Sequence, residues 1–224
     1  MAQKTNLRTA ESVSPKHPDK LCDQISDAIL DAYLAKDPQA RVAVETVGGH
    51  GEVFVVGEVT STATIDIAPI VKRIAGDVTL RHNIVKQSPQ IANGVDTGGA
   101  GDQGIMVGYA TAETTEFLPL EVVLARELNR HLYELWPYDG KTQITLKNGV
   151  IDTIVASWQN VPQQNLAGQV LTWYKHQDKK LIKEPVTIHA NPAGDWDLGG
   201  FDADTGLTGR KLVVDNYGPS IPIG

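Results

Sequence analysis

The feature of this sequence that most constrains its fold is an order of elements that occurs twice. Apolar residues with the period of a helix come first, then two segments in which apolar and polar residues alternate, then a shorter helical stripe and a last strand pattern. In the first copy these segments are the helix from Leu21 to Tyr33, the hairpin of residues 41–62, the short helix of residues 67–74 and the strand of residues 83–87.

The second copy begins roughly 100 residues after the first. In its hairpin, Asn148-Gly149 suits a two-residue type I′ turn. A further strand is predicted ahead of each copy, at residues 6–13 and 104–111, and a third pattern of this kind is present at residues 210–218. The segments of the second copy are the helix from Leu120 to Leu135, the hairpin of residues 142–157, the short helix of residues 166–173 and the strand of residues 186–190.

The repeated order predicts an α+β fold of βαββαβ-like units, two of them complete and a third only begun. We expect a first unit at residues 1–95, a second at 96–203 and the start of a third at 204–224. Helices cover one face of the sheet in such units, and the other face needs a second sheet or a subunit. A chain without its last unit should therefore expose an apolar sheet face or edge unless a partner covers it.

Composition narrows the class of protein further. With 224 residues, 41% of them hydrophobic, the chain can form a sizeable core, and its net charge of -7 argues against a broad nucleic-acid or membrane surface. An anion would have to be held by a few local cations. The single cysteine, Cys22, excludes a disulfide within the chain. Because no stretch reads as a signal peptide or a membrane span, we expect a soluble cytoplasmic protein.

The first stretch that could carry chemistry is "SVSPKHPDK", residues 12–20. Its prolines restrict the backbone where a helix is about to start, and free N–H groups at a helix start attract anions. His17 and Lys20 add donors, and Asp19 could ligate a hard cation such as Mg²⁺. The alternative is plain helix capping by Ser14 or Asp19.

The second stretch is glycine-rich, "GVDTGGAGDQG" at residues 94–104. Its six glycines would let the backbone approach a ligand closely or let the loop move, and Asp96 and Asp102 lie among them. The pattern matches neither the phosphate-binding loop nor the dinucleotide fingerprint. A flexible connector between units is the alternative.

Two further stretches pair acidic and basic residues. Arg210 and Lys211 would enter a strand, so both could face one ligand only if the backbone bends there. The preceding Asp202 and Asp204 suit a ribose hydroxyl or a metal, and a solvated turn is the alternative. In "YDGK" the carboxylate and ammonium of residues 139 and 141 would share a strand face, although this could also be a surface hairpin start.

Several ionisable or aromatic residues have structural interpretations. Glu45 and Glu58 lie within apolar strands, so each needs a cationic partner or a strand end in water, and we favour a partner for Glu45. Cys22 is interpreted as a packing residue, and the histidines show no metal-ligand spacing. Predicted solvated helix positions are Asp23, Asp27 and Asp31, and predicted core positions are Trp136, Trp158 and Trp173.

Taken together, five motifs resemble the S-adenosylmethionine synthetase family. They are "ESVSPKHPDKLCDQISDAILD", "KQSPQI", "GAGDQGIMVGYAT", "YDGKTQIT" and "GLTGRKLVVDNYG", in that order from about residue 10 to the end. The resemblance implies three similar α+β units about a pseudo-threefold axis. It also implies a homodimer through sheet faces, or a dimer of dimers, with active sites between subunits.

The activity implied by the resemblance joins ATP and L-methionine. The methionine sulfur attacks C5′ of ATP, tripolyphosphate leaves, and it is then cleaved to pyrophosphate and phosphate. Because the leaving group is highly charged, preorganised cations should supply most of the transition-state stabilisation. The implied cofactors are Mg²⁺ and K⁺.

The resemblance also implies a role for each matching residue. His17 would steady the departing oxygen, and three cations would hold the polyphosphate. The implied sets are His17, Lys141, Arg210 and Lys211 for catalysis and ATP; Asp139, Ser157, Trp196 and Asp204 for ATP; Glu58, Gln87 and Asp102 for methionine; Asp19 for Mg²⁺; and Glu45 for K⁺.

Some positions depart from the family pattern. Gln90 stands where the family usually has Asp, Asp195 stands where a basic residue is common, and the segment between Gln87 and Asp102 is shorter than usual. A glycine-rich segment with lysines and a second Mg²⁺-binding Asp does not follow within the 224 residues, so a continuation of the chain or a partner chain would have to supply it. Two alternatives stay open: a noncatalytic or regulatory subunit that associates with a complete synthetase, and a phosphohydrolase that only cleaves tripolyphosphate.

Overall fold

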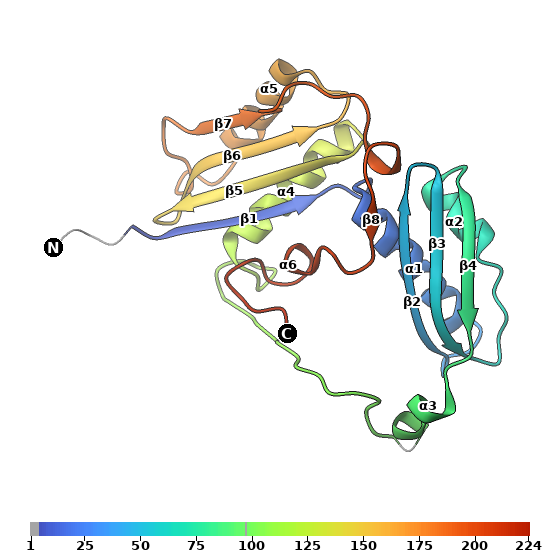
Figure 1. The fold of residues 1–224 in the computed structure, drawn as a ribbon. Coiled ribbons are helices and arrows are strands. Elements are labelled where there is room, and N and C mark those ends of the chain that lie inside the picture. The colour runs from blue at the N-terminus through green and yellow to red at the C-terminus, as the bar shows by residue number, and fades with distance from the viewer. Residues whose placement is uncertain (1–4, 97) are drawn as a thin grey trace. The chain divides into compact units, whose positions relative to one another are not determined.

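The computed structural model describes residues 5–96 and 98–224 and divides them into two compact units. The β2 unit contains residues 18–106 and 200–210. The β5 unit contains the described part of residues 1–17 together with residues 107–199 and 211–223. Both units consist of segments that are far apart in the sequence (Figure 1). No helix among the described residues has the length and apolar character needed to cross a membrane.

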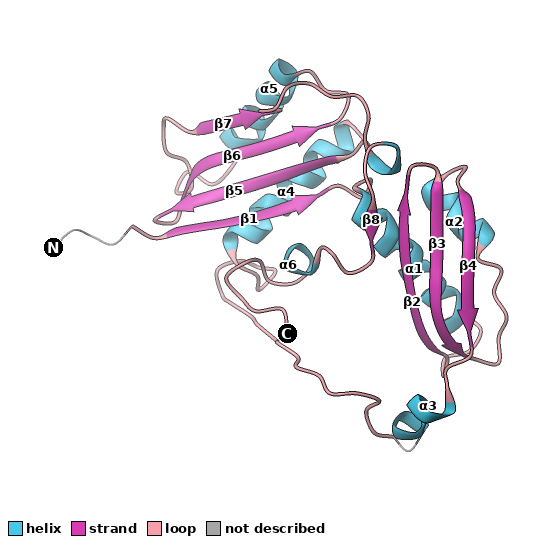
Figure 2. Cartoon of the chain, viewed as in Figure 1, coloured by secondary structure: helices cyan, strands magenta, loops and turns pink. Residues whose placement is uncertain are grey.

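The β5 unit is a four-stranded sheet with helices on one face (Figure 2). The strand order is β1-β5-β6-β7, in which β1, β5 and β6 are antiparallel and β7 runs parallel to β6. Its elements are β1 (Leu7–Val13), α4 (Leu120–Leu135), β5 (Gly140–Lys147), β6 (Val150–Trp158), α5 (Gln163–Lys175), β7 (Thr187–Ala190) and α6 (Leu212–Asp215).

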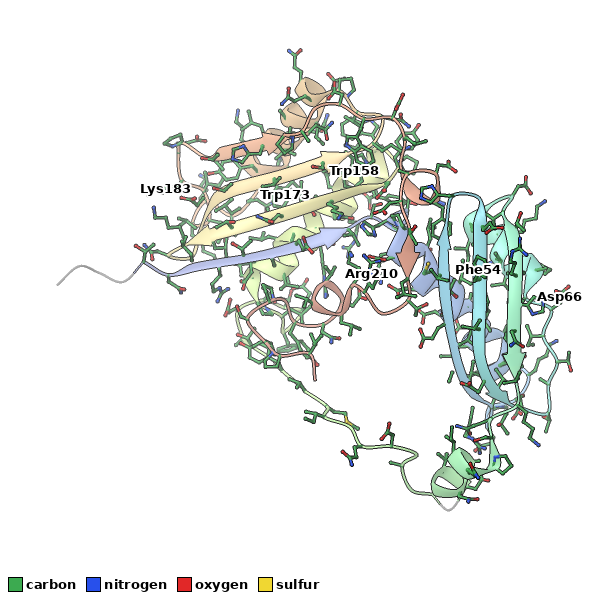
Figure 3. All side chains as sticks on the ribbon, in the orientation of Figure 1. Phe54, Asp66, Trp158, Trp173, Lys183 and Arg210 are labelled. Carbon is green, nitrogen blue, oxygen red and sulfur yellow. The ribbon has the colours of Figure 1, made fainter. Side chains whose placement is uncertain are left out.

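The core of the β5 unit lies between the sheet and helices α4 and α5. Leu128, Ile144 and Ile154 are fully buried there. Trp158, also fully buried, donates its indole N–H to the Trp136 carbonyl at 2.9 Å, and Trp173 is 7% exposed (Figure 3). These tryptophans are core residues, as their apolar surroundings in the sequence predicted.

The β2 unit repeats the same layering around a second four-stranded sheet. Its strand order is β4-β3-β2-β8; β3 and β8 are antiparallel to β2, and β4 is parallel to β3. Its elements are α1 (Pro18–Leu34), β2 (Arg41–Gly49), β3 (Glu52–Thr60), α2 (Ala68–Ala75), β4 (Thr79–Val85), α3 (Pro89–Asp96), the 3₁₀ helix η1 (Gly200–Asp202) and β8 (Gly206–Leu207).

The core of the β2 unit includes a residue contributed from late in the chain. Phe201 of η1 packs with Cys22 and Ile25 of α1. A Cβ at Gly48 would lie 2.6 Å from the Phe201 ring, so this position of β2 requires glycine. Burial raises the pKa of the Cys22 thiol to about 12, which agrees with its predicted packing role.

The repeated order of elements is confirmed in both units. The helices, hairpins and last strands of the two repeats are present, and Gly76 ends α2. Both hairpin turns have two residues with positive φ: 52° and 80° at His50-Gly51, and 53° and 82° at Asn148-Gly149. The α+β class predicted from the sequence is therefore confirmed.

Two local predictions are wrong. Residues 104–111, all within the described part of the chain, form no strand, and Ile105 and Met106 are 79% and 89% exposed. Residues 210–218 form a turn and α6 instead of a strand. The glycine-rich segment of residues 94–104 begins with the last three residues of α3 (Pro89–Asp96), and its Thr97 lies outside the described residues.

Candidate functional site

The "SPKHPDK" stretch forms a tight turn that leads into α1. The Ser14 hydroxyl accepts the Lys16 amide at 3.1 Å, and the Ser14 carbonyl accepts the His17 amide at 3.1 Å. The Ser14 amide in turn donates to the Gly140 carbonyl at 2.8 Å, which fixes the turn to the start of β5. Only 5% of His17 is exposed. The turn therefore fixes the backbone at the predicted catalytic histidine.

Asp19 and Arg210 come together in the β2 unit, although they are 191 positions apart. Arg210 Nε lies 3.5 Å from Asp19 Oδ1, and the same oxygen accepts the Leu207 amide at 2.9 Å. The Asp19 side chain is 2% exposed, whereas that of Arg210 is 54% exposed. A buried carboxylate thus anchors a guanidinium that reaches solvent.

Asp23 is not on a solvated helix face, so that prediction is wrong. It is 9% exposed because residues 206–209 cover this side of α1, and its Oδ1 accepts the Gly209 amide at 2.9 Å. Lys20 Nζ lies 3.1 Å from its other carboxylate oxygen, an ion pair without hydrogen-bond geometry. Asp27 and Asp31 are exposed, as predicted.

Arg210 and Lys211 lie in a turn, not in a strand. The turn spans residues 208–211 and contains Gly209 with a φ of 76°. Strand alternation therefore does not separate the two side chains. Lys211 immediately precedes α6. Whether the side chains of Arg210 and Lys211 face the same ligand is not tested by this geometry, so it stays a prediction.

In the β5 unit, Lys141 and Ser157 are register partners on neighbouring strands. They point to the sheet face opposite α4 and α5, since the alternate residues Thr142 and Trp158 are buried under those helices. Lys141 is exposed. The structure thus brings these two predicted ATP ligands together.

Asp139 lies just before β5 and is 8% exposed. Its backbone amide donates to the Gln159 side chain at 3.2 Å, and its carbonyl accepts the Gln159 amide at 2.9 Å. Gln159 Nε2 reaches on to the Asp197 carbonyl at 2.8 Å. Gln159 therefore links Asp139 to the segment that carries Trp196.

Trp196 lines a pocket of about 330 Å³ in the β5 unit, together with Asn160 and Pro162. The Asn160 amide fixes this segment by donating to the Trp196 carbonyl at 2.9 Å. Asp195, one of the departures from the family pattern, accepts the Gln163 amide at the start of α5 at 2.8 Å. Its carboxylate has a capping role that suits the positive end of a helix.

Glu45 is exposed, so the burial argument that favoured a cationic partner for it does not apply. β2 buries its alternate residues Val44 and Thr46 against α1, and Glu45 points to the sheet face that α1 and α2 leave open. Glu58 lies on the same open face, next to the exposed apolar residues Phe54 and Val56.

A row of polar residues crosses the end of that open face. Arg41 and Thr60 are register partners, and the parallel register of β3 and β4, extended by two residues, brings Gln87 level with them. Arg41 Nε, Thr60 Oγ1 and Gln87 Oε1 are buried and find no hydrogen-bond partner within the described residues. Arg41 Nη1 also pairs with Asp96 of α3 at 2.8 Å.

Arg41 is a candidate ligand-binding residue that was not predicted from the sequence. A cation at the start of an apolar strand was the signal that could have indicated it.

Two other predicted residues stay apart from these clusters. Asp102 and Asp204 are exposed, and each accepts the amide of the residue that follows it, at 2.7 Å. No group of three His, Cys, Asp or Glu side chains suited to a metal is found in residues 5–96 and 98–224.

The fold defines a class of protein built from α+β units, each with a sheet that helices cover on one face. Residues 5–96 match the model of the S-adenosylmethionine synthetase N-terminal domain, and residues 97–196 match that of the central domain. The chain therefore belongs to the S-adenosylmethionine synthetase family.

Curated relatives agree with this assignment. The chain is 40% identical to an S-adenosylmethionine synthase of Corynebacterium glutamicum and 41% identical to one of Thermus thermophilus, each over 97% of this chain and 67% of the relative. It is 39% identical to one of Clostridium tetani, over 95% of this chain and 66% of the relative. The chain thus spans about two thirds of the length of the relatives it matches.

Proposed function

We propose that this chain carries out S-adenosylmethionine synthesis, in which the adenosyl group of ATP is transferred to the sulfur of L-methionine. One observation carries the proposal beyond the family assignment. Two family motifs that are 191 positions apart place the Arg210 guanidinium beside the buried Asp19 carboxylate at the start of α1. A cation so anchored, at a helix start, is suited to hold a polyphosphate.

In the proposed reaction the residues of this chain bind and orient ATP for attack at C5′. Lys141, Arg210 and Lys211 would hold the triphosphate, and His17 would donate a hydrogen bond to the oxygen that leaves C5′. Negative charge grows on the triphosphate as the carbon–oxygen bond breaks. The cations would therefore stabilise the transition state more than the ground state. The same residues would then retain tripolyphosphate for its cleavage to pyrophosphate and phosphate.

The nucleoside would occupy the pocket beside Trp196. Its volume of about 330 Å³ is at the lower end of the range for small-molecule sites and suits one aromatic base. Stacking on the indole would hold the adenine, while Asp139 and Ser157 would lie toward the sugar and phosphate. Asp204 is assigned to the ribose by resemblance alone.

By resemblance Asp19 would be one ligand of a Mg²⁺ site, which its 2% exposed carboxylate would have to share with Arg210 and the Leu207 amide. Its carboxylate oxygens are hard donors, and Mg²⁺ is usually bound by one or two carboxylates, substrate phosphates and water. When bound, Mg²⁺ would neutralise part of the phosphate charge. Glu45 offers one exposed carboxylate for K⁺, and further oxygens would have to come from beyond its own strand.

Methionine would bind at the open face of the β2 unit, where Glu58 and Gln87 lie. The buried Gln87 Oε1 and Arg41 Nε, which find no hydrogen-bond partner within the described residues, suit the ammonium and carboxylate groups of an amino acid. Asp102 would approach the same ligand from the glycine-rich segment. We also propose that the chain acts in the cytoplasm as a homodimer, a dimer of dimers or with a partner chain.

The test incubates the purified chain with ATP, methionine, Mg²⁺ and K⁺ and looks for S-adenosylmethionine by mass spectrometry. We expect product from the wild-type chain and none from Lys141→Ala, whereas Lys147→Ala, farther along the same strand, should stay active. ATP binding without product would support the noncatalytic alternative. Phosphate release from tripolyphosphate alone, without any product from methionine, would support the phosphohydrolase alternative.

A further inference from the structure

Residues 206–209 are fixed to α1 and β2 by their own backbone groups. The Leu207 amide donates to Asp19 Oδ1 and the Gly209 amide to Asp23 Oδ1, both at 2.9 Å. Residues i and i+4 of a helix lie next to each other on one face, about 5–6 Å apart. Asp19 and Asp23 can therefore both accept amides from the same short segment beside α1.

Thr208 lies between Leu207 and Gly209 and is itself bound to Thr46 of β2. Its backbone N–H donates to the Thr46 carbonyl at 2.9 Å, and its Oγ1 accepts the Thr46 amide at 2.7 Å. The Thr208 hydroxyl also donates to the Thr46 carbonyl at 3.1 Å. Ser26 Oγ of α1 lies 3.0 Å from Thr208 Oγ1 and 2.9 Å from Thr46 Oγ1. Thr208 thus stands in for a strand partner at this point of β2.

The approach of the segment to α1 is close. A Cβ at Gly206 would lie 2.1 Å from the Pro18 carbonyl oxygen, so only glycine allows it. One residue after the last of these contacts comes Arg210, whose side chain returns to Asp19 (Figure 3). The position of the guanidinium therefore depends on how the backbone of residues 207–209 is held.

We propose that Asp23 and Thr208 are positioning residues of the polyphosphate site: by fixing the backbone of residues 207–209 they place the Arg210 guanidinium beside Asp19. This inference rests on the proposed function, because Arg210 is taken to contact the phosphates. Neither Asp23 nor Thr208 is assigned any contact with the ligand itself.

The experiment measures the affinity of the full chain for inorganic tripolyphosphate with Mg²⁺ by calorimetry. Asp23→Ala should weaken binding about tenfold, since loss of the acceptor frees the Gly209 amide and the turn that follows it. Asp23→Asn keeps an oxygen at this position and should stay within about threefold of wild type. Asp31→Ala, on the exposed side of the same helix, is the matched control and should bind like wild type.

A double-mutant cycle separates positioning from general stability. If Asp23 acts through Arg210, Asp23→Ala should cost little further affinity in the Arg210→Ala background. Equal losses in both backgrounds would overturn the proposal, as would an unchanged affinity of Asp23→Ala. If Asp23→Ala does not fold, Thr208→Val and its conservative partner Thr208→Ser take its place in the cycle with the same expectations.

A failure of the proposed function gives a different result. A wild-type chain that binds neither tripolyphosphate nor ATP would overturn the polyphosphate site and this inference with it. A wild-type chain that binds both while Asp23→Ala and Thr208→Val bind equally well would overturn the positioning role alone.

Discussion

At the scale of single residues, the proposed reaction depends most on His17. The turn at residues 14–17 buries its side chain and fixes its backbone. We predict that His17→Ala lowers kcat for S-adenosylmethionine formation by about 10²–10³-fold, the usual loss for one oxyanion donor, with a smaller change in KM for ATP. Steady-state kinetics on the purified variant would measure this. His82→Ala, at an exposed position of β4, is the control, and an unchanged kcat for His17→Ala would remove His17 from this role.

Asp37 provides a prediction about pH at the same scale. Its carboxylate accepts the Thr62 amide at 2.8 Å, the Ser61 hydroxyl at 2.8 Å and the Gln39 amide at 3.1 Å. These hydrogen bonds lower its pKa to about 2. The stability it contributes is therefore present above its ordinary pKa, about 3.9, and is lost as pH falls toward 2.

We accordingly expect Asp37→Ala to unfold at a lower temperature than wild type at pH 7. The gap should narrow as pH falls from about 4 to about 2, which thermal denaturation followed by circular dichroism can measure. Asp31→Ala should show no such gap. A difference that persists unchanged down to the lowest pH would contradict the assignment.

At the scale of elements, α6 is a helix that its own sequence does not favour. Leu212, Val213 and Val214 are apolar, and the two valines are β-branched, which favours a strand. Arg126 of α4 overrides this preference: its Nη2 donates to the carbonyls of Val214, Asp215 and Asn216 at 2.7, 2.9 and 2.9 Å. A guanidinium from another element thus satisfies the end of this short helix.

We predict that Arg126→Ala lowers the free energy of unfolding by about 2 kcal/mol, because it leaves partly buried carbonyls without a donor. Urea denaturation would measure the loss. The matched control is Arg130→Ala, one turn further along α4 and exposed, which should change stability little. Equal effects of the two substitutions would mean that α6 does not depend on Arg126.

The elements also show what a sequence can and cannot predict. The stripe from Leu21 to Tyr33 and the Asn148-Gly149 turn are local patterns, and both were predicted. The pairing of β1 with β5 joins Leu7 to Lys147, which periodicity cannot reveal. Asp23 was misjudged for the same reason, since the segment that buries it lies 186 residues away.

The candidate site, like the fold, was predicted from the sequence only in part. Motif resemblance indicated Asp19 and Arg210 as separate site residues, but neither their mutual contact nor the positioning contacts of Thr208. The types of residue and their spacing indicated which side chains could take part in the chemistry. Which backbone amides and carbonyls hold those groups depends on tertiary contacts.

At the scale of the whole molecule, the open face of the β2 unit carries exposed apolar side chains. Phe54, Val56 and Val85 are 39%, 49% and 48% exposed on β3 and β4. Exposed apolar side chains on a sheet face that the helices of the unit leave open are typical of an interface. We expect a second copy of the chain to cover this face.

Phe54→Glu should therefore shift the chain toward a monomer in sedimentation velocity, since it buries a charge in the expected interface. Ala68→Glu adds the same charge to α2, on the covered side of the sheet, and should leave the association state unchanged. A wild-type chain that is monomeric at all concentrations would contradict the expected dimer.

The central claim at this scale is that cations from distant parts of the sequence converge on one triphosphate. A crystal structure with Mg²⁺ and a nonhydrolysable ATP analogue tests it most directly. We predict that nitrogen atoms of four residues lie within hydrogen-bonding distance of the leaving triphosphate, within one chain or across a subunit boundary: His17, Lys141, Arg210 and Lys211. Side chains that point to separate surfaces, in every assembly the molecule forms, would contradict it.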